Sequence, residues 1–216
     1  MKSLLVKHIN INSPIEAQQV HALLDAKKVE WNAVDNVCWA ENYPYAPDVK
    51  FRIAHTGDTI MINYKVKEKA VRAVAETDNG RVWEDSCCEF FISPARDDMY
   101  YNIECNCAGK ILFESGNTRH DRKRYPLSTV ATIKRWSSLG NGVFEETPRE
   151  EEWEMSLIIP AAMFEGVKDF TGMKSNANFY KCGDKLTTPH FLSWNLVETE
   201  TPDYHRPEYF GKIVFE

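Results

Sequence analysis

The chain has 216 residues and a mass of 24.9 kDa, a size at which β-sandwiches often form one domain. Hydrophobic residues make up 43% and charged residues 27%, a globular mixture that excludes disorder, collagen and coiled coil for most of the chain. The net charge of −6 argues against a nucleic-acid-binding protein, since such proteins are more often basic. The apolar runs are far shorter than the ~20 residues that span a bilayer, so we expect no membrane segment.

The N-terminal residues 1–12 contain two lysines but no continuous apolar segment and no small-residue cleavage site. This pattern predicts a cytoplasmic protein, or a secreted or periplasmic one from which a leader has been removed. The sequence leaves both open.

One helix is predicted near the start of the chain. Ser13 to Glu16 reads as a capping box with proline at the first helical position, and Val20 and Leu24 continue an apolar stripe. We therefore expect a helix over residues 14–26, within an N-terminal helical or loop segment that covers about 1–50.

The rest of the chain reads as short strands separated by turn residues. In the second of them Ile60 and Ile62 alternate with Met61 and Asn63, the period of a strand. About ten such segments predict an all-β fold, a sandwich of two antiparallel sheets that is jelly-roll-like, as one domain over 1–216. The segments are 51–54, 59–67, 70–76, 88–93, 100–107, 110–113, 130–136, 153–159, 176–182, 191–194 and 212–215.

The cysteines are predicted to be core residues. Cys105 and Cys107 share one strand face with Tyr101 and Ile103, and Cys88 alternates with apolar neighbours in the same way. No pair of cysteines has zinc-ligand spacing, so we expect structural thiols, with a metal or redox role as the alternative.

Two carboxylates form a candidate catalytic or ligand-binding pair. Glu89 and Glu104 face the same way on strands joined by a short loop. Paired carboxylates could serve acid/base catalysis in a glycosidase, hydrogen-bond a ligand's hydroxyl groups, or form a solvated sheet face. No other catalytic motif is present.

Aromatic residues also lie beside turn residues, among them Trp83 and Tyr204. A ring held on a loop can present its face to the apolar face of a sugar, and it can equally plug the end of a sandwich.

Four motifs occur in the order that family 9 carbohydrate-binding modules show. Residues 82–92 resemble the family's W-E-x-D-S-V-E-I-F-I-D stretch, and residues 153–160 resemble its later strand ending in I-P. Residues 177–194 are similar to its N-F-Y-R and S-W pair, and residues 205–211 to its H-x-P-E-x-F-G close. The resemblance covers residues 50–216.

This resemblance implies a β-sandwich of the DOMON type that binds a mono- or oligosaccharide without catalysis. Trp83 matches the first of two aromatic clamp residues, and Tyr204 falls where the second stands. Glu89 matches an acidic contact, and Glu104 falls where the family has an arginine. The remaining expected polar contacts are Asn102 and Lys181.

The resemblance implies no cofactor. Some family members hold structural calcium, for which Asp97, Asp98 and Asp184 are the candidate ligands here. Two other functions stay open: a glycoside hydrolase that uses Glu89 and Glu104, and an interaction protein that kept the sandwich and lost the sugar site.

Overall fold

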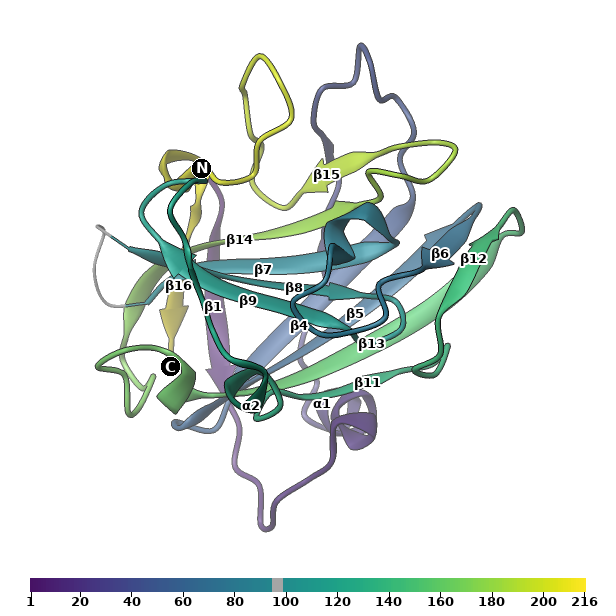
Figure 1. Ribbon diagram of the computed structural model, residues 1–216. Coiled ribbons are helices and arrows are strands. Elements are labelled where there is room, and N and C mark those ends of the chain that lie inside the picture. The colour runs from purple at the N-terminus through teal and green to yellow at the C-terminus, as the bar shows by residue number, and fades with distance from the viewer. Residues whose placement is uncertain (95–98) are drawn as a thin grey trace.

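Two layers of β-strands face each other in the computed structural model, which describes residues 1–94 and 99–216 (Figure 1). The predicted β-sandwich is confirmed. The first layer contains the strands that follow one another in the order β10 (Lys123–Arg124), β9 (Ile111–Gly116), β8 (Tyr100–Asn106), β7 (Cys87–Ser93), β14 (Lys174–Cys182) and β16 (Gly211–Phe215). The second contains β4 (Asp48–His55), β5 (Thr59–Glu68), β13 (Glu151–Pro160) and β11 (Lys134–Ser137).

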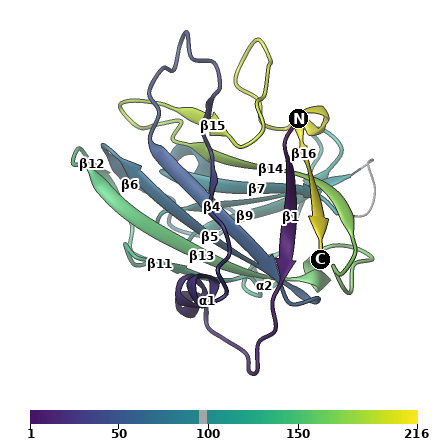
Figure 2. The same cartoon turned by 180° about the vertical axis from the view of Figure 1, so that it is seen from behind.

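Strand β1 (Ser3–His8) connects the two layers. Its first residues pair in parallel with β16 and its last two pair in parallel with β4, and Figure 2 shows it beside both. The expectation of only helix or loop over residues 1–50 is therefore wrong, because β1 is an integral part of both layers.

Short strands cover the margins of the layers. A separate two-stranded sheet is formed by β6 (Val71–Ala73) and β12 (Phe144–Thr147). The strand predicted over residues 70–76 corresponds to β6, which spans only three residues. The other marginal strands are β2 (Asn32–Ala33), β3 (Asn36–Val37) and β15 (Phe191–Ser193).

The N-terminal helix begins later than predicted. Helix α1 spans Val20–Ala26 and follows a 3₁₀ turn over Ala17–Gln19. The capping box forms between Glu16 and Gln19, whose Oε1 accepts a hydrogen bond from the Glu16 N–H at 2.8 Å. Ser13 therefore does not cap the helix, and the apolar face of α1 packs on the outer side of the second layer.

A second short helix, α2 (Leu127–Val130), occupies part of the region predicted as a strand over 130–136. Pro126 stands at its N-cap, where a proline's extended backbone leads into a helical turn. The strand itself, β11, begins only at Lys134. Among the described residues, neither helix approaches the length and apolar character needed to cross a bilayer.

The core lies between the two layers and is rich in aromatic rings. Phe51 of β4 stacks on Phe179 of β14 with 3.6 Å between ring centroids. Cys88, Cys105 and Cys107 are buried in this same cluster, which confirms them as core side chains.

One ion pair is buried at the edge of the core. The Lys181 Nζ lies 2.9 Å from the Glu68 carboxylate, and neither side chain has exposed surface. Burial alone would lower the pKa of Lys181, but the charge of Glu68 raises it above its ordinary value. Trp153 donates its indole N–H to Glu68 at 2.8 Å, so the carboxylate is held from both layers.

We predict that Lys181→Met lowers the free energy of unfolding by about 3–5 kcal/mol, because the Glu68 charge would remain buried without its partner. Urea unfolding measures this difference. Lys67→Met, which removes an exposed lysine paired with Glu150, is the control and should leave stability nearly unchanged. Equal losses in the two variants would contradict the role of the buried pair.

Candidate functional site

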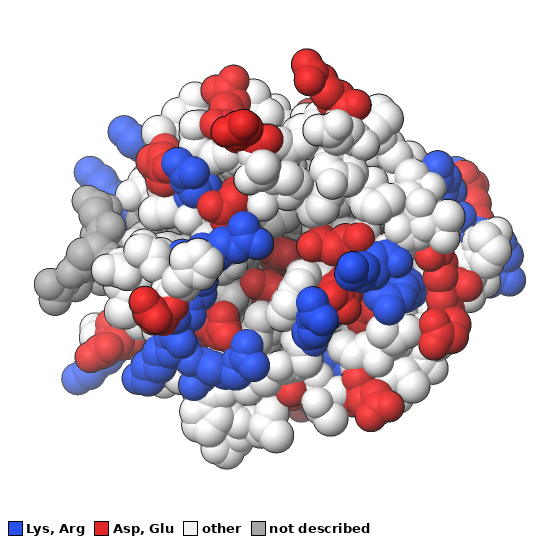
Figure 3. All heavy atoms as spheres, turned by 45° about the horizontal axis from the view of Figure 1, so that its top comes forward, with Lys and Arg blue, Asp and Glu red and all other residues white. Residues whose placement is uncertain are grey.

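A cavity of about 250 Å³ opens on the outer face of the first layer, the face turned away from the core. The side-chain alternation of three strands supplies its floor, and loops from distant parts of the chain supply its walls. In Figure 3 this side of the molecule is hollowed near its middle, where acidic atoms lie deep and basic atoms stand around them. The residues that line it are Trp39, Trp83, Glu89, Glu104, Leu112, Glu114, Arg119, Arg122, Arg124, Cys182, Asp184, Phe191, Pro202, Asp203, Tyr204 and His205.

The floor of the cavity contains two buried carboxyl groups. Glu89 on β7 and Glu104 on β8 stand directly opposite each other in the antiparallel ladder, so both side chains point to the same face. The Cys182 thiol donates a hydrogen bond to Glu89 Oε1 at 3.0 Å, and the Asn102 amide donates to Glu104 Oε1 at 2.8 Å. The sequence-based pairing of Glu89 with Glu104 on one face is therefore confirmed.

Burial disfavours the ionised form of the carboxyl groups in the floor of the cavity. Desolvation raises the pKa of Glu104 to about 8, and desolvation together with the neighbouring Glu104 raises the pKa of Glu89 well above its usual range. Burial and the nearby Glu84 also raise the pKa of Asp184, to about 6. A protonated carboxyl can both donate and accept a hydrogen bond, which is what a ligand hydroxyl group requires.

Aromatic rings form the walls. Trp83 lies on a 3₁₀ turn over Val82–Glu84, which the Asp184 N–H holds against the end of β14 by a 3.2 Å hydrogen bond to the Trp83 carbonyl. The Trp83 ring is half-buried, with the Arg81 guanidinium 5.8 Å from its centroid. Trp83 and Tyr204, which are far apart in sequence, thus border one cavity.

Tyr204 is a packed wall and not a free stacking platform. Only 9% of it is exposed, its ring stacks on Tyr180 at 4.0 Å, and its hydroxyl donates to the carbonyl oxygens of Lys181 and Leu192. Its ring centroid lies 5.7 Å from that of Trp39. One face of Tyr204 is therefore unavailable to a ligand.

Trp39 is the aromatic wall that the sequence reasoning missed. Its indole N–H donates to the Thr199 carbonyl at 2.7 Å, which ties the loop before β4 to the loop before β16. A positive φ of 56° at Trp39 marks a strained turn, and no periodic pattern surrounds it. Its place beside tyrosines and prolines in residues 31–50 was the available signal.

Three arginines that follow β9 stand at the rim, and one of them, Arg124, lies in β10. Arg122 donates to Asn102 Oδ1 at 2.7 Å, Arg124 pairs with Glu114 at 2.8 Å, and Arg119 donates to the Pro202 carbonyl at 3.2 Å. Each guanidinium therefore holds protein groups in place. The basic run over residues 119–124 signalled these residues in the sequence.

Two of the expected polar contacts are placed differently. Lys181 points to the opposite face of β14, into the ion pair with Glu68, so its predicted contact with a ligand is wrong. Asn102 is fully buried, and its amide is bonded to both Glu104 and Arg122. It supports the site from behind.

The calcium expectation falls mostly outside the described residues. Asp97 and Asp98 are not among them, and Asp184 lines the cavity. The prediction of structural calcium stays a prediction.

A β-sandwich with an aromatic-walled polar cavity on one sheet face is the architecture of a ligand-binding module. The family model described as carbohydrate-binding family 9 matches residues 18–215, and the chain belongs to that family. The resemblance seen in the four sequence motifs is confirmed.

Solved structures share this fold. A provisionally named carbohydrate-binding protein from Bacteroides uniformis ATCC 8492 is 49% identical, with a TM-score of 0.97 over 100% of this chain and 99% of that one. A family 9 module from Caldicellulosiruptor kristjanssonii in complex with glucose has a TM-score of 0.57 and 14% identity, over 100% and 96% of the two chains. Its complex with cellotriose gives 0.58 and 13%, over 100% and 94%. No curated protein matches the sequence.

We predict that Glu104→Gln stabilises the protein at pH 8. Because the pKa of Glu104 rises from 4.5 to about 8 on folding, the folded state binds more protons than the unfolded state between these values, and stability falls as pH rises. The neutral amide avoids this penalty, roughly a few kcal/mol at pH 8 and much less at pH 5.

Urea unfolding of parent and variant at both pH values measures the effect. Glu145→Gln, at an exposed position, is the control and should leave the pH dependence unchanged. A Glu104→Gln variant less stable than the parent at pH 8 would show that the carboxylate is favourable there, against this account.

Proposed function

We propose that the chain binds a mono- or oligosaccharide in this cavity and does not cleave it. The observation that carries the proposal is the combination of indole rings with buried carboxyl groups in one hollow, in a member of carbohydrate-binding family 9. A pyranose has apolar C–H faces and polar hydroxyl groups, so it needs both kinds of contact. The family 9 modules of C. kristjanssonii hold glucose and cellotriose, which supports this ligand class.

The aromatic contact is assigned to Trp83 and Trp39, with Tyr204 as a further, fixed part of the wall. Two rings that bury on the order of 100–200 Å² of apolar surface contribute ~2.5–5 kcal/mol before the cost of association. The net affinity should then fall in the roughly micromolar to millimolar range. Hydrogen bonds to Glu89 and Glu104 select among sugars of similar shape.

The environment of the two carboxyl groups favours binding over hydrolysis. A glycosidase needs one protonated acid and one ionised base or nucleophile, so its two carboxyl groups have environments that push their pKa values apart. Here burial raises the pKa of both Glu89 and Glu104. Both shifts go in the same direction and disfavour the ionised form, whereas hydrolysis needs one of the two carboxyl groups kept ionised.

One observation favours a different function. Tyr204 packs on Tyr180, so one of the two clamp rings implied by the family resemblance is not free. A sandwich that has lost its sugar site and serves as an interaction protein would show such packing. Direct binding measurements distinguish the two functions.

We predict that Trp83→Ala and Trp39→Ala each weaken sugar binding by about tenfold or more, which corresponds to ~1.4 kcal/mol of lost stacking. Calorimetric titration with glucose, cellotriose and a wider panel, each also with its reducing end chemically reduced, measures the affinities. Trp31→Ala is the matched control, because Trp31 lies outside the cavity against Arg52.

Unchanged affinity in Trp83→Ala would overturn the placement of the site. If no sugar in the panel binds the parent protein, the interaction protein is favoured. Release of shorter sugars from an incubated oligosaccharide, lost in Glu104→Gln, would instead establish the hydrolase.

A further inference from the structure

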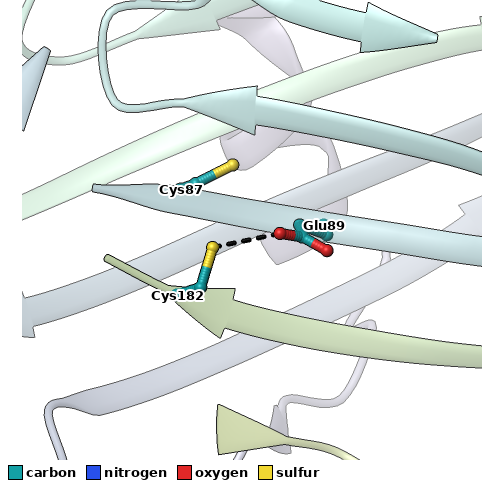
Figure 4. Close-up of side chains that lie close together, drawn as sticks. All are labelled: Cys87, Glu89 and Cys182. Carbon is teal, nitrogen blue, oxygen red and sulfur yellow. Dashed lines mark hydrogen bonds between the residues drawn. The ribbon is translucent and has the colours of Figure 1, made fainter. Parts of the chain in front are cut away.

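The wall of the cavity where β7 meets β14 brings two thiols and a carboxyl group together. Cys87 and Cys182 are direct partners in the antiparallel ladder, and Glu89 follows two residues later on the same face of β7. One ligand atom from each of the three lies within 4.8 Å of the others. Figure 4 shows the Cys182 thiol and the Glu89 carboxyl group turned toward each other, with Cys87 beside them at the start of β7. Backbone pairing, and not a loop, fixes their arrangement.

We propose that Cys87, Glu89 and Cys182 form a binding site for a borderline-soft divalent cation of the zinc class. Two sulfurs and one carboxylate oxygen match the ligands that zinc takes in proteins, whereas calcium and magnesium prefer oxygen alone. The inference goes beyond sugar binding, although it shares Glu89 with the proposed sugar contacts.

The spacing of the donors fits such an ion after small side-chain rotations. With Zn–S bonds of about 2.3 Å and a Zn–O bond of about 2.1 Å, tetrahedral ligand atoms stand roughly 3.6–3.8 Å apart. The upper limit of 4.8 Å between the donor atoms is about one ångström wider, and Cys182 Sγ already lies 3.0 Å from Glu89 Oε1.

In the described part of the chain, the carboxyl groups around the three donors have no basic side chain bound to them. Glu104 stands opposite Glu89, and Asp184 follows Cys182 by two residues. Within residues 1–94 and 99–216, no ion pair reaches Glu89, Glu104 or Asp184, because Lys181 is bound to Glu68 on the other face and the rim arginines bind other groups. A divalent ion bound by Glu89 would therefore not have to displace a basic side chain.

Metal binding would exchange protons for the ion. Two metal–sulfur bonds and one metal–oxygen bond form, the two thiol protons leave to solvent, and the Glu89 carboxyl also releases its proton when it carries one. Cys182 and Glu89 line the cavity and Cys87 lies behind them, so the ion would enter from the cavity. Because Cys182 and Glu89 line the cavity, a water molecule there could serve as the fourth ligand.

The test uses the full chain, treated with a chelator and kept reduced by a phosphine. Zinc affinity is measured by competition with a chromophoric chelator, and cobalt serves as the spectroscopic probe, because a thiolate–cobalt bond gives a near-ultraviolet charge-transfer band. We expect one equivalent of metal and a clear band in the parent protein.

Cys182→Ser is the central variant, because a serine hydroxyl can still donate to Glu89 while it removes one soft ligand. We expect a weakening of zinc binding beyond the ~10–100-fold typical of losing an outer-shell partner, with loss of most of the band. Cys107→Ser is the matched control, since that buried thiol donates to the Arg72 carbonyl away from the cluster. It should bind as the parent does.

Circular dichroism checks that each variant folds. If Cys182→Ser does not fold, Glu89→Gln takes its place, and we expect weaker zinc binding with both thiols kept. A parent protein without a thiolate–cobalt band, or a folded variant with the parent's zinc affinity, would overturn the proposal. Because no sugar is present, these results stand apart from the test of sugar binding.

Discussion

The register that joins β7, β8 and β14 determines both the core and the cavity. Along these strands side chains alternate between two faces, so Phe90, Ile103 and Phe179 enter the space between the layers while Glu89 and Glu104 face outward. A shift of one residue in this pairing would bury the two carboxyl groups in the core and expose the phenylalanines. Core packing and the placement of the site therefore have a common cause.

Polar side chains are buried on both sides of this layer, an ion pair on the inner side and two carboxyl groups on the outer side. On the inner side Lys181 and Glu68 neutralise each other at 2.9 Å, which fixes the end of β14 against β5. On the outer side Glu89 and Glu104 have no cationic partner within residues 1–94 and 99–216, so burial raises their pKa values. The buried ion pair stabilises the fold. The carboxyl groups of Glu89 and Glu104 line the cavity, where they can interact with a ligand.

The alternation of residues was sufficient to predict the sandwich, the core cysteines and the shared face of Glu89 and Glu104. The alternation could not predict which face of β14 Lys181 occupies, because apolar residues occur on both faces of this strand. Only packing against the second layer determines which face belongs to the core. The position of Trp39 depends on a contact with Thr199, 160 residues further along the chain. The packing of Tyr204 depends on a loop folding back on Tyr180 of β14, which strand periodicity does not reveal. Strand β1 was missed for a similar reason, since it pairs with the last strand of the chain.

The central claim is that a sugar enters between Trp39 and Trp83. Nuclear magnetic resonance of ¹⁵N-labelled protein resolves the indole N–H signals of the six tryptophans during a titration with a sugar that binds. We expect the signals of Trp39 and Trp83 to shift together with one saturation curve, while those of Trp31, Trp136, Trp153 and Trp194 stay in place. Saturation of the protein without a shift at Trp39 and Trp83, or with the main shift at Trp31 or Trp136, would contradict it.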